Sequence, residues 1–434
     1  MIYDTVRSDV LGCYGNPDPV TPFTDTLARN GNQFFNAIAP APWTLPSHTS
    51  MLTGVYSHKH GARFVSKGKG RELSGHSIGL PSPGVKTLPA ILKKNNYFSL
   101  CIGGAPALNP SMGLTRDFDI VDCYNPLRSA SEINHVTEHY LSTLDKDKPL
   151  FLLINYFDAH GPYVRHDLHG GPWLSNLPGN RFIDFYTRLE DGRMLTEHIA
   201  AGDLTVTDSE MIYAKALYQS EVAFIDRYAE RLNRLLQETR GDRPLIIILA
   251  SDHGELFGEH NLVDHSRTLH NELIFVPLII QSAHWQNHLF ETPVSLTDLF
   301  STIIDLSGLS SVQTADSHSL LPLLKSTSMK HESPVSEVYR DETWIKNTSE
   351  VFNRDLRSMI LNDSKKVVWS DRDEPLLYDL SKDWFENSGR LPTAEESAII
   401  ETWDKAHPTV IPHGRLMEEH VTEQLKALGY ISSH

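Results

Sequence analysis

Two runs of apolar residues, 149–157 and 244–251, stand out in the hydrophobic pattern of the chain. Uniformly apolar runs of this length are typical of strands buried on both faces, and such strands are usually parallel. Between them, residues 211–237 carry apolar side chains at helical spacing, namely Leu217, Val222, Ile225, Leu232 and Leu235. The alternation of strand, helix and strand predicts an α/β fold in which helices flank a mostly parallel central sheet.

After about residue 309 the pattern changes. Residues 365–369 and 375–380 are typical of a hairpin, and helix-prone residues follow to the end of the sequence. We therefore predict a catalytic domain over residues 1–325 and a small C-terminal α+β subdomain over residues 326–434. Within the first domain, residues 165–210 are rich in glycine, proline and charge, which favours a surface excursion near the mouth of a site.

Composition narrows the class of protein. The chain has 55 acidic and 39 basic residues, and its formal net charge of -16 disfavours nucleic acid or an anionic membrane surface as a partner. Its three cysteines (Cys13, Cys101 and Cys123) cannot form a disulfide framework, so buried thiols are expected. No apolar run has the length of a membrane span and the N-terminus lacks the features of a signal peptide, which predicts a cytoplasmic protein.

Polar residues suited to a metal site lie next to the predicted strands. Asp252 and His253 directly follow the run 244–251, and Asp4 lies near the start of the chain. Because ligands of open α/β sheets bind beyond the carboxyl ends of the strands, these side chains are expected to share one site. Carboxylates with one imidazole suit a divalent cation; manganese, calcium and magnesium are favoured, and zinc stays open. Two alternatives remain: Asp4 could be a turn residue, and Asp252 with His253 could cap a helix that begins after Gly254.

Thr44 is the candidate nucleophile of this site. A hydroxyl beside a divalent cation can lose its proton and attack an ester, which turns a weak nucleophile into a catalytic one. Thr44 could instead be an ordinary hydroxyl at a helix N-terminus, although both roles are compatible because the helix dipole favours an anionic substrate group. Ser47, three residues further on, is the rival nucleophile.

In eight segments the chain resembles the sulfatase family of the alkaline phosphatase superfamily: residues 4–15, 21–28, 45–54, 60–61, 158–163, 251–255, 276–279 and 377–380. The resemblance implies a twisted mixed sheet between helices, a small C-terminal subdomain, and one divalent cation held by Asp4, Thr44, Asp252 and His253. It also implies a long apolar strand before Asp4, whereas only three residues precede it here. Two alternatives remain: the start of the sequence is misassigned and a secretion signal lies upstream, or the central strand is short and Asp4 is poorly fixed.

Departures from the family's pattern narrow the chemistry. The sulfatases proper oxidise the cysteine of a Cys-x-Pro-x-Arg motif to formylglycine, whereas Thr44 and His48 stand at its cysteine and arginine positions here. The segment after Leu100 also lacks the Lys-Trp-His that family members use to hold sulfate. A formylglycine hydrate releases sulfate by collapsing to the aldehyde, but a threonine ester must be attacked at its central atom. In having threonine at the nucleophile position, the chain is similar to the phosphodiesterases, phosphomutases and phosphoglycerol transferases of the superfamily. This resemblance favours phosphate esters as substrates.

The resemblance also assigns roles to three histidines. His160 is expected to donate a proton to the leaving-group oxygen, and His265 takes the place of a lysine that contacts the transferred group. His48 stands in for the arginine that orients the nucleophile. The remaining candidates, His60, His260 and His270, are expected to be structural.

The sequence therefore predicts a metal-dependent hydrolase that cleaves phosphate or sulfate esters through a covalent Thr44 intermediate. Its substrate is expected to be a small-molecule or glycan ester, and its oligomeric state is open. Two alternatives remain. One is transfer of the phospho group to a glycan or another alcohol, and the other is a catalytically inactive binding protein that retains the fold.

Overall fold

A computed structural model describes residues 1–434 apart from 66–71, 74–75, 126, 146, 165–188, 192, 284, 310–313, 315, 326–331, 363, 413–418, 429 and 431–434. Within the described residues, a nine-stranded sheet forms the centre of the molecule, in the order β13-β2-β12-β9-β1-β8-β6-β7 with β14 beside β2. Its strands are β1 (Ile2–Tyr3), β2 (Asn32–Ile38), β6 (Phe98–Gly103), β7 (Ile120–Asp122), β8 (Leu150–Tyr156), β9 (Ile246–Ala250), β12 (Phe275–Ser282), β13 (His288–Phe290) and β14 (Val294–Ser295).

The predicted α/β fold and both predicted strands are confirmed, as β8 and β9. Strand β1 runs parallel to both of these neighbours, and β6 runs parallel to β8 and β7. Strand β12 is antiparallel to β9 and to β2. The interpretation of β9 as a parallel strand was therefore right on its β1 side and wrong on its β12 side, because an apolar run records burial and not the direction of the neighbouring strand.

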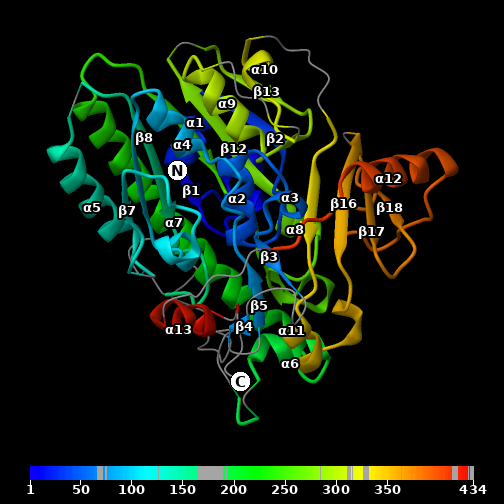
Figure 1. Ribbon diagram of the computed structural model, residues 1–434. Helices are drawn as coiled ribbons and strands as arrows, with labels where there is room; N and C mark the ends of the chain where they lie inside the picture. The colour runs from blue at the N-terminus through cyan, green and yellow to red at the C-terminus, as the bar shows by residue number, and fades with distance from the viewer. Residues whose placement is uncertain are drawn as a thin grey trace.

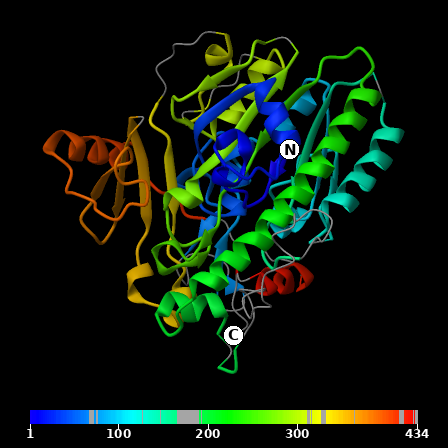
Figure 2. The same ribbon diagram turned by 180° about the vertical axis from the view of Figure 1, so that it is seen from behind.

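Helices cover both faces of the sheet (Figure 1). Helix α7 (Asp208–Thr239) contains the predicted helix 211–237 and begins at a capping box formed by Thr207 and Glu210. It packs beside α5 (Ala130–Thr143) on the face turned to the viewer in Figure 2. Three helices pack together on the other face: α2 (Thr44–Thr53), α4 (Leu88–Lys94) and α9 (Asp298–Leu306).

Smaller elements surround this core. Two of them are the antiparallel pair β10 (Leu256–Phe257) with β11 (Val263–Asp264) and the small sheet of β3 (Arg63–Phe64), β4 (Glu72–Leu73) and β5 (His76–Gly79). The helices not yet named are α1 (Pro22–Arg29), α3 (Ser57–His60), α6 (Leu195–Ala201), α8 (Asn271–Ile274), α10 (Leu321–Lys325), α11 (Glu342–Asn347), α12 (Ala394–Ala406) and α13 (Glu419–Ala427). Much of the predicted excursion, residues 165–188, lies outside the described residues, and its last part contains α6.

A second sheet stands beside the first (Figure 1). It is antiparallel, in the order β15 (Val335–Val338), β16 (Leu356–Asn362), β17 (Lys365–Ser370) and β18 (Leu376–Asp379), which confirms the predicted hairpin. The chain then returns to the large sheet, since Val421, Leu425, Leu428 and Tyr430 belong to its main hydrophobic core. The domain boundary near residue 325 stays a prediction.

Strand β1 is much shorter than the strands on either side. Ile2 pairs with Asn155 of β8 and with Ala250 of β9, so the earlier residues of both neighbours extend beyond β1. A cavity of about 540 Å³ lies there, lined by residues 150–154, residues 246–248 and helices from both faces of the sheet. The expectation of a short central strand is confirmed. Among the described residues, none of the helices combines the length and apolar character that crossing a membrane requires.

Candidate metal and nucleophile site

Asp4 lies at the carboxyl end of β1 and is firmly held. Its N–H donates to the carbonyl of Tyr156 (2.9 Å), and the side-chain amide of Asn155 donates to Asp4 Oδ2 (2.8 Å). The next residue, Thr5, has a left-handed φ of 60° and donates its hydroxyl to the carbonyls of Asp4 (2.7 Å) and Ala159 (2.8 Å). A turn is thus present at Asp4, alongside its candidate metal role. The expectation of a poorly fixed Asp4 is wrong, because β8 and the loop after it hold Asp4 and Thr5 by these hydrogen bonds.

Asp252 and His253 follow β9 at the same edge of the sheet. No helix begins after Gly254; the chain enters β10, so the helix-cap alternative is wrong. Asp252 Oδ1 accepts hydrogen bonds from the N–H groups of Thr5 (3.2 Å) and His253 (3.1 Å). His253 Nδ1 lies 2.9 Å from the carbonyl of Gly254, so it carries the ring proton and Nε2 presents its lone pair. Burial lowers the pKa of His253 to about 4, which keeps the ring neutral.

These three side chains converge beside Thr44. His253 Nε2 lies 3.5 Å from Asp252 Oδ2, 3.9 Å from Asp4 Oδ1 and 3.3 Å from Thr44 Oγ1. Asp4 Oδ1 and Asp252 Oδ2 are both buried and accept no hydrogen bond. Burial and the neighbouring Asp252 carboxylate raise the pKa of Asp4 well above its usual range. Facing carboxylate oxygens with an imidazole lone pair between them are costly in isolation, so this donor set fits one divalent metal ion.

Thr44 is the first residue of α2, and its side chain is 1% exposed. The N-terminus of α2 places its positive dipole end beside Oγ1, which favours an anionic group at this position. The hydroxyl of Ser47 instead donates to the backbone carbonyl of Asp252 (2.7 Å). Of the two candidate nucleophiles, Thr44 therefore faces the carboxylate and histidine cluster, and Ser47 ties α2 to the loop that carries Asp252.

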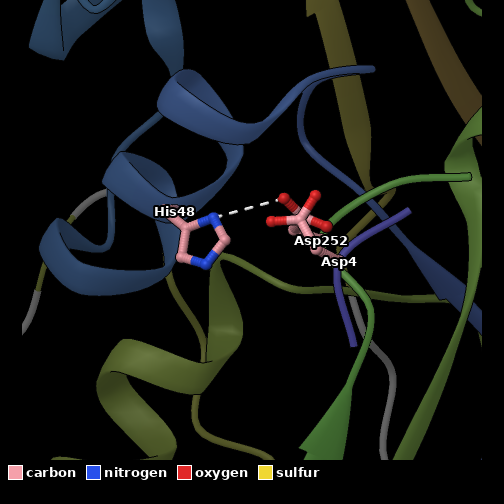
Figure 3. A group of neighbouring side chains, drawn as sticks. All are labelled: Asp4, His48 and Asp252. Carbon is pink, nitrogen blue, oxygen red and sulfur yellow. Dashed lines mark ion pairs between the residues drawn. The ribbon is translucent and has the colours of Figure 1, made fainter. Parts of the chain in front are cut away.

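His48 points from α2 toward the two carboxylates (Figure 3). Its Nδ1 lies 3.1 Å from the carbonyl of Thr44 and 3.3 Å from Asp252 Oδ2. By position alone, Asp4, His48 and Asp252 could hold a metal ion, since their nearest ligand atoms lie within 4.8 Å of one another. However, Nδ1 is hydrogen-bonded to the carbonyl of Thr44 and therefore bears a proton. His48 thus holds Thr44 and Asp252 in place, while the unprotonated Nε2 of His253 is the better ligand.

A tyrosine that the sequence analysis missed lies on the other side of Thr44. Tyr430 Oη lies 3.2 Å from Thr44 Oγ1, 3.0 Å from His160 Nε2 and 3.1 Å from His265 Nε2. Nothing in the pattern around Tyr430 pointed to a site, because a tyrosine shortly after a helix is compatible with ordinary core packing. The structure thus brings together all the predicted catalytic residues and adds a phenol between them.

The two histidines beside Tyr430 differ in charge. His265 Nδ1 lies 3.0 Å from Asp264 Oδ1 and 3.2 Å from Glu255 Oε1. Burial opposes the charged form of His265, but Tyr430, Glu255 and Asp264 together raise its pKa well above its usual range. His160 Nδ1 faces the carbonyl of Gly161 at 2.8 Å, and burial lowers the pKa of His160 to about 3. A charged imidazole therefore lies next to a neutral one.

The three histidines expected to be structural have other partners in the described part of the chain. His60 Nε2 lies 3.0 Å from the hydroxyl of Ser50. The rings of His260 and His270 stack at 3.6 Å, and His260 also lies 3.3 Å from a carboxylate oxygen of Glu272. These contacts are consistent with structural roles.

Comparisons with known proteins place this site in a family. The family model described as Sulfatase matches residues 1–309. An uncharacterised sulfatase of Escherichia coli (strain K12), YidJ, is 24% identical over 70% of this chain and 66% of that protein. The multifunctional alkaline phosphatase superfamily protein PehA of Trinickia caryophylli is 24% identical over 88% of this chain and 87% of that protein.

The fold is also that of solved structures. The crystal structure of the phosphonate monoester hydrolase of Agrobacterium radiobacter matches with a TM-score of 0.70 at 18% identity and covers 93% of both chains. The family uses a divalent metal ion, and the carboxylate and histidine groups described above are candidate ligands for one. The chain belongs to the sulfatase family of the alkaline phosphatase superfamily, and it is a hydrolase of sulfate or phosphate esters.

Proposed function

We propose that this protein hydrolyses phosphate monoesters or diesters by nucleophilic attack of Thr44, with one divalent metal ion held by Asp4, Asp252, His253 and Thr44. The observation that carries the proposal is the pair of buried carboxylate oxygens that accept no hydrogen bond and face His253 Nε2 beside the Thr44 hydroxyl. The ion, when bound, supplies the positive charge that makes a hydroxyl acidic and offsets negative charge on the transferred group. Manganese, calcium and magnesium suit this oxygen-rich donor set best, and zinc is the next choice.

The residues around Thr44 support its role as the nucleophile. His48 holds the backbone carbonyl of Thr44 and the carboxylate of Asp252 in one arrangement, which orients the hydroxyl toward the ligands. The hydroxyl of Ser47 is engaged with a backbone carbonyl and does not face the carboxylate cluster. Thr44 attacks the central atom, the bond to the leaving-group oxygen breaks, and water then attacks the same atom to release Thr44.

The charge difference between the two histidines suggests separate roles. His265, charged and held between two carboxylates, contacts the transferred group as the lysine of related proteins does. His160 lies 3.0 Å from the same phenol oxygen, and we assign it to the leaving-group oxygen. Since neutral His160 presents a lone pair at Nε2, it donates to the leaving group only after it has received a proton, and the Thr44 hydroxyl releases one when it attacks.

Phosphate is favoured over sulfate because Thr44 cannot release its product by forming an aldehyde. Hydrolysis at phosphorus on this fold has a precedent in the name of the phosphonate monoester hydrolase that shares it. The ester is a small-molecule or glycan substrate in this proposal. Transfer to an alcohol acceptor in place of water uses the same Thr44 intermediate, and the experiment below separates the two outcomes.

The test combines a substrate panel with trapping of the intermediate. The metal-loaded protein is assayed with matched aryl phosphate, phosphodiester, phosphonate and sulfate esters, with and without added alcohols, and acid-quenched samples are digested and searched for a modified peptide. We expect phosphate esters to react at least about a hundredfold faster than the sulfate, which needs about 3 kcal/mol in barrier. We also expect a phosphorylated Thr44 that is absent in Thr44→Ala, while Ser47→Ala keeps most of the activity. An adduct on Ser47, or faster cleavage of sulfate, would refute the proposal, and a phosphorylated alcohol product would show transfer.

A further inference from the structure

The Tyr430 hydroxyl is buried, but it lies among polar side chains of the candidate site. Its oxygen has one proton and two lone pairs, and it has three polar neighbours, Thr44, His160 and His265. The nitrogen that His265 turns toward it is Nε2, because Nδ1 faces Glu255 and Asp264. His160 turns an unprotonated nitrogen toward it, because its other nitrogen faces the Gly161 carbonyl. The phenol oxygen therefore lies within hydrogen-bond distance of the nucleophile and of both histidines at once.

This oxygen lies where a substrate would have to react. An ester attacked by Thr44 must place its central atom about 3–3.5 Å from Oγ1 and its oxygens within reach of the surrounding donors. Tyr430 Oη is 3.2 Å from Oγ1 and within 3.1 Å of both histidines. The phenol oxygen and a transferred phosphoryl group cannot occupy this point together.

Burial of the site leads to the same conclusion. Thr44, Asp4, Asp252 and His253 are at most 1% exposed, and Tyr430 itself is 4% exposed. An enzyme that acts on an external ester must expose Thr44, so a covering group has to move. Tyr430 is in direct contact with the nucleophile, and it comes from a different part of the chain than the metal ligands.

Tyr430 is anchored through a short helical segment. We call α13 together with Leu428 and Tyr430 the C-terminal cap. The N–H of Tyr430 donates to the carbonyl of Leu425 (2.9 Å). The apolar residues of the cap pack on the main core, and α13 contacts the 3-10 turn Pro106–Leu108. The ring of Tyr430 lies 5.8 Å from the ring of Trp43, the residue before Thr44. The cap therefore connects Thr44 to α13. The packing contacts of α13 can be weakened by a substitution that alters no metal ligand.

We propose that the C-terminal cap is a displaceable cover of the active site, in which the Tyr430 hydroxyl competes with the transferred group of the substrate for Thr44, His160 and His265. The identity of that group rests on the function proposed above, but the competition itself concerns any tetrahedral oxyanion that enters the site. When only the fraction of molecules with a displaced cap can bind, the apparent dissociation constant rises by the inverse of that fraction. Weakening the cap must then tighten binding, which is the opposite of what damage to a site residue does.

The experiment measures binding of inorganic phosphate and of sulfate to the full-length, metal-loaded protein by titration calorimetry. Tyr430→Phe removes the hydroxyl and keeps the ring, and we expect it to lower the dissociation constant of at least one of these oxyanions about tenfold. Leu425→Ala weakens the anchoring of the cap outside the site and should act in the same direction. The matched control is Tyr14→Phe, which removes a buried phenol hydroxyl bonded to the carbonyls of Phe34 and Leu278 and should leave oxyanion binding unchanged.

The outcomes separate the cap from the proposed chemistry. Tighter oxyanion binding in Tyr430→Phe supports the cap whether or not the phosphate esters of the panel are turned over. With an active substrate, the same variant should show a lower KM. Unchanged or weaker oxyanion binding would refute the cap, and a tenfold loss of kcat at constant KM would make Tyr430 a working part of catalysis.

Discussion

The two ends of the central sheet differ in how they fill the space around β1. At the carboxyl end, Asp4 is held by backbone and side-chain bonds from β8, and the ligand cluster around it is closely packed. At the amino end, β8 and β9 extend past Ile2, and a cavity of about 540 Å³ separates them. The same two strands therefore border a closed site at one end and an incompletely filled core at the other.

This difference shows that the geometry of the site does not depend on the length of β1. Asn155 connects Asp4 to the loop after β6. Its side-chain nitrogen donates to Asp4 Oδ2, and its side-chain oxygen accepts from the N–H of Ala105. The position of Asp4 is thus fixed by β8 and the adjacent loop. The amino end contributes to stability instead, so changes at the two ends should affect different properties: metal binding and catalysis at one, the free energy of unfolding at the other.

The largest effect is expected from the metal ligands at the carboxyl end. The double variant Asp252→Asn with His253→Ala removes one charge and one lone pair, and we expect it to lose the bound cation while keeping its fold. Metal content measured by mass spectrometry and far-UV circular dichroism checks both parts. His260→Ala is the control, since it removes an imidazole outside the cluster. A double variant that keeps its full metal content would remove these residues from the ligand set.

Asn155→Ala tests whether β8 fixes the position of Asp4. It leaves Asp4 Oδ2 without its donor, and outer partners of this type commonly contribute 10-fold to 100-fold to metal affinity. We expect a loss of about this size in titrations with manganese followed by electron paramagnetic resonance, with a smaller change in melting temperature. If metal affinity stayed as in the wild type, β8 would not be what positions Asp4.

His160→Ala tests the leaving-group side of the site. Nitrophenolate leaves without a proton and an alkoxide does not, so the variant should lose far more activity with alkyl esters than with nitrophenyl esters. The ratio of the two losses in kcat/KM is the measurement, and His139→Ala, an exposed residue of the helix α5, is the control. Equal losses with both esters would exclude His160 as the proton donor.

Local sequence patterns explain which residues of the candidate site could be predicted. Asp4, Asp252, His253 and Thr44 could be predicted because each lies in a local pattern, at the end of an apolar strand or beside a motif. Tyr430 could not be found in this way, because its contact with Thr44 joins residues 386 positions apart and depends on how the chain returns to the core.

One alternative was wrong and one prediction was only partly right, for a related reason. A helix after Gly254 was compatible with the residues there, but pairing of Leu256 and Phe257 with β11 decides the structure. Likewise, the apolar run of β9 shows that the strand is buried and cannot show that β12 lies antiparallel beside it. In each case the structure of a segment depends on the strand that pairs with it, and the sequence pattern of one segment does not show which strand that is.

The smallest effect is expected at the amino end of the sheet and concerns stability. Ile248 of β9 lines the cavity there, so a change at this side chain alters apolar packing and no metal ligand.

Ile248→Ala removes apolar atoms from this end of the sheet. We expect it to lower the free energy of unfolding, measured with a denaturant, by about 2 kcal/mol and to keep its metal affinity. Ile248→Val, which removes a single methylene group, is the control and should have a smaller effect. An alanine variant that altered metal affinity and not stability would overturn the separation of the two ends.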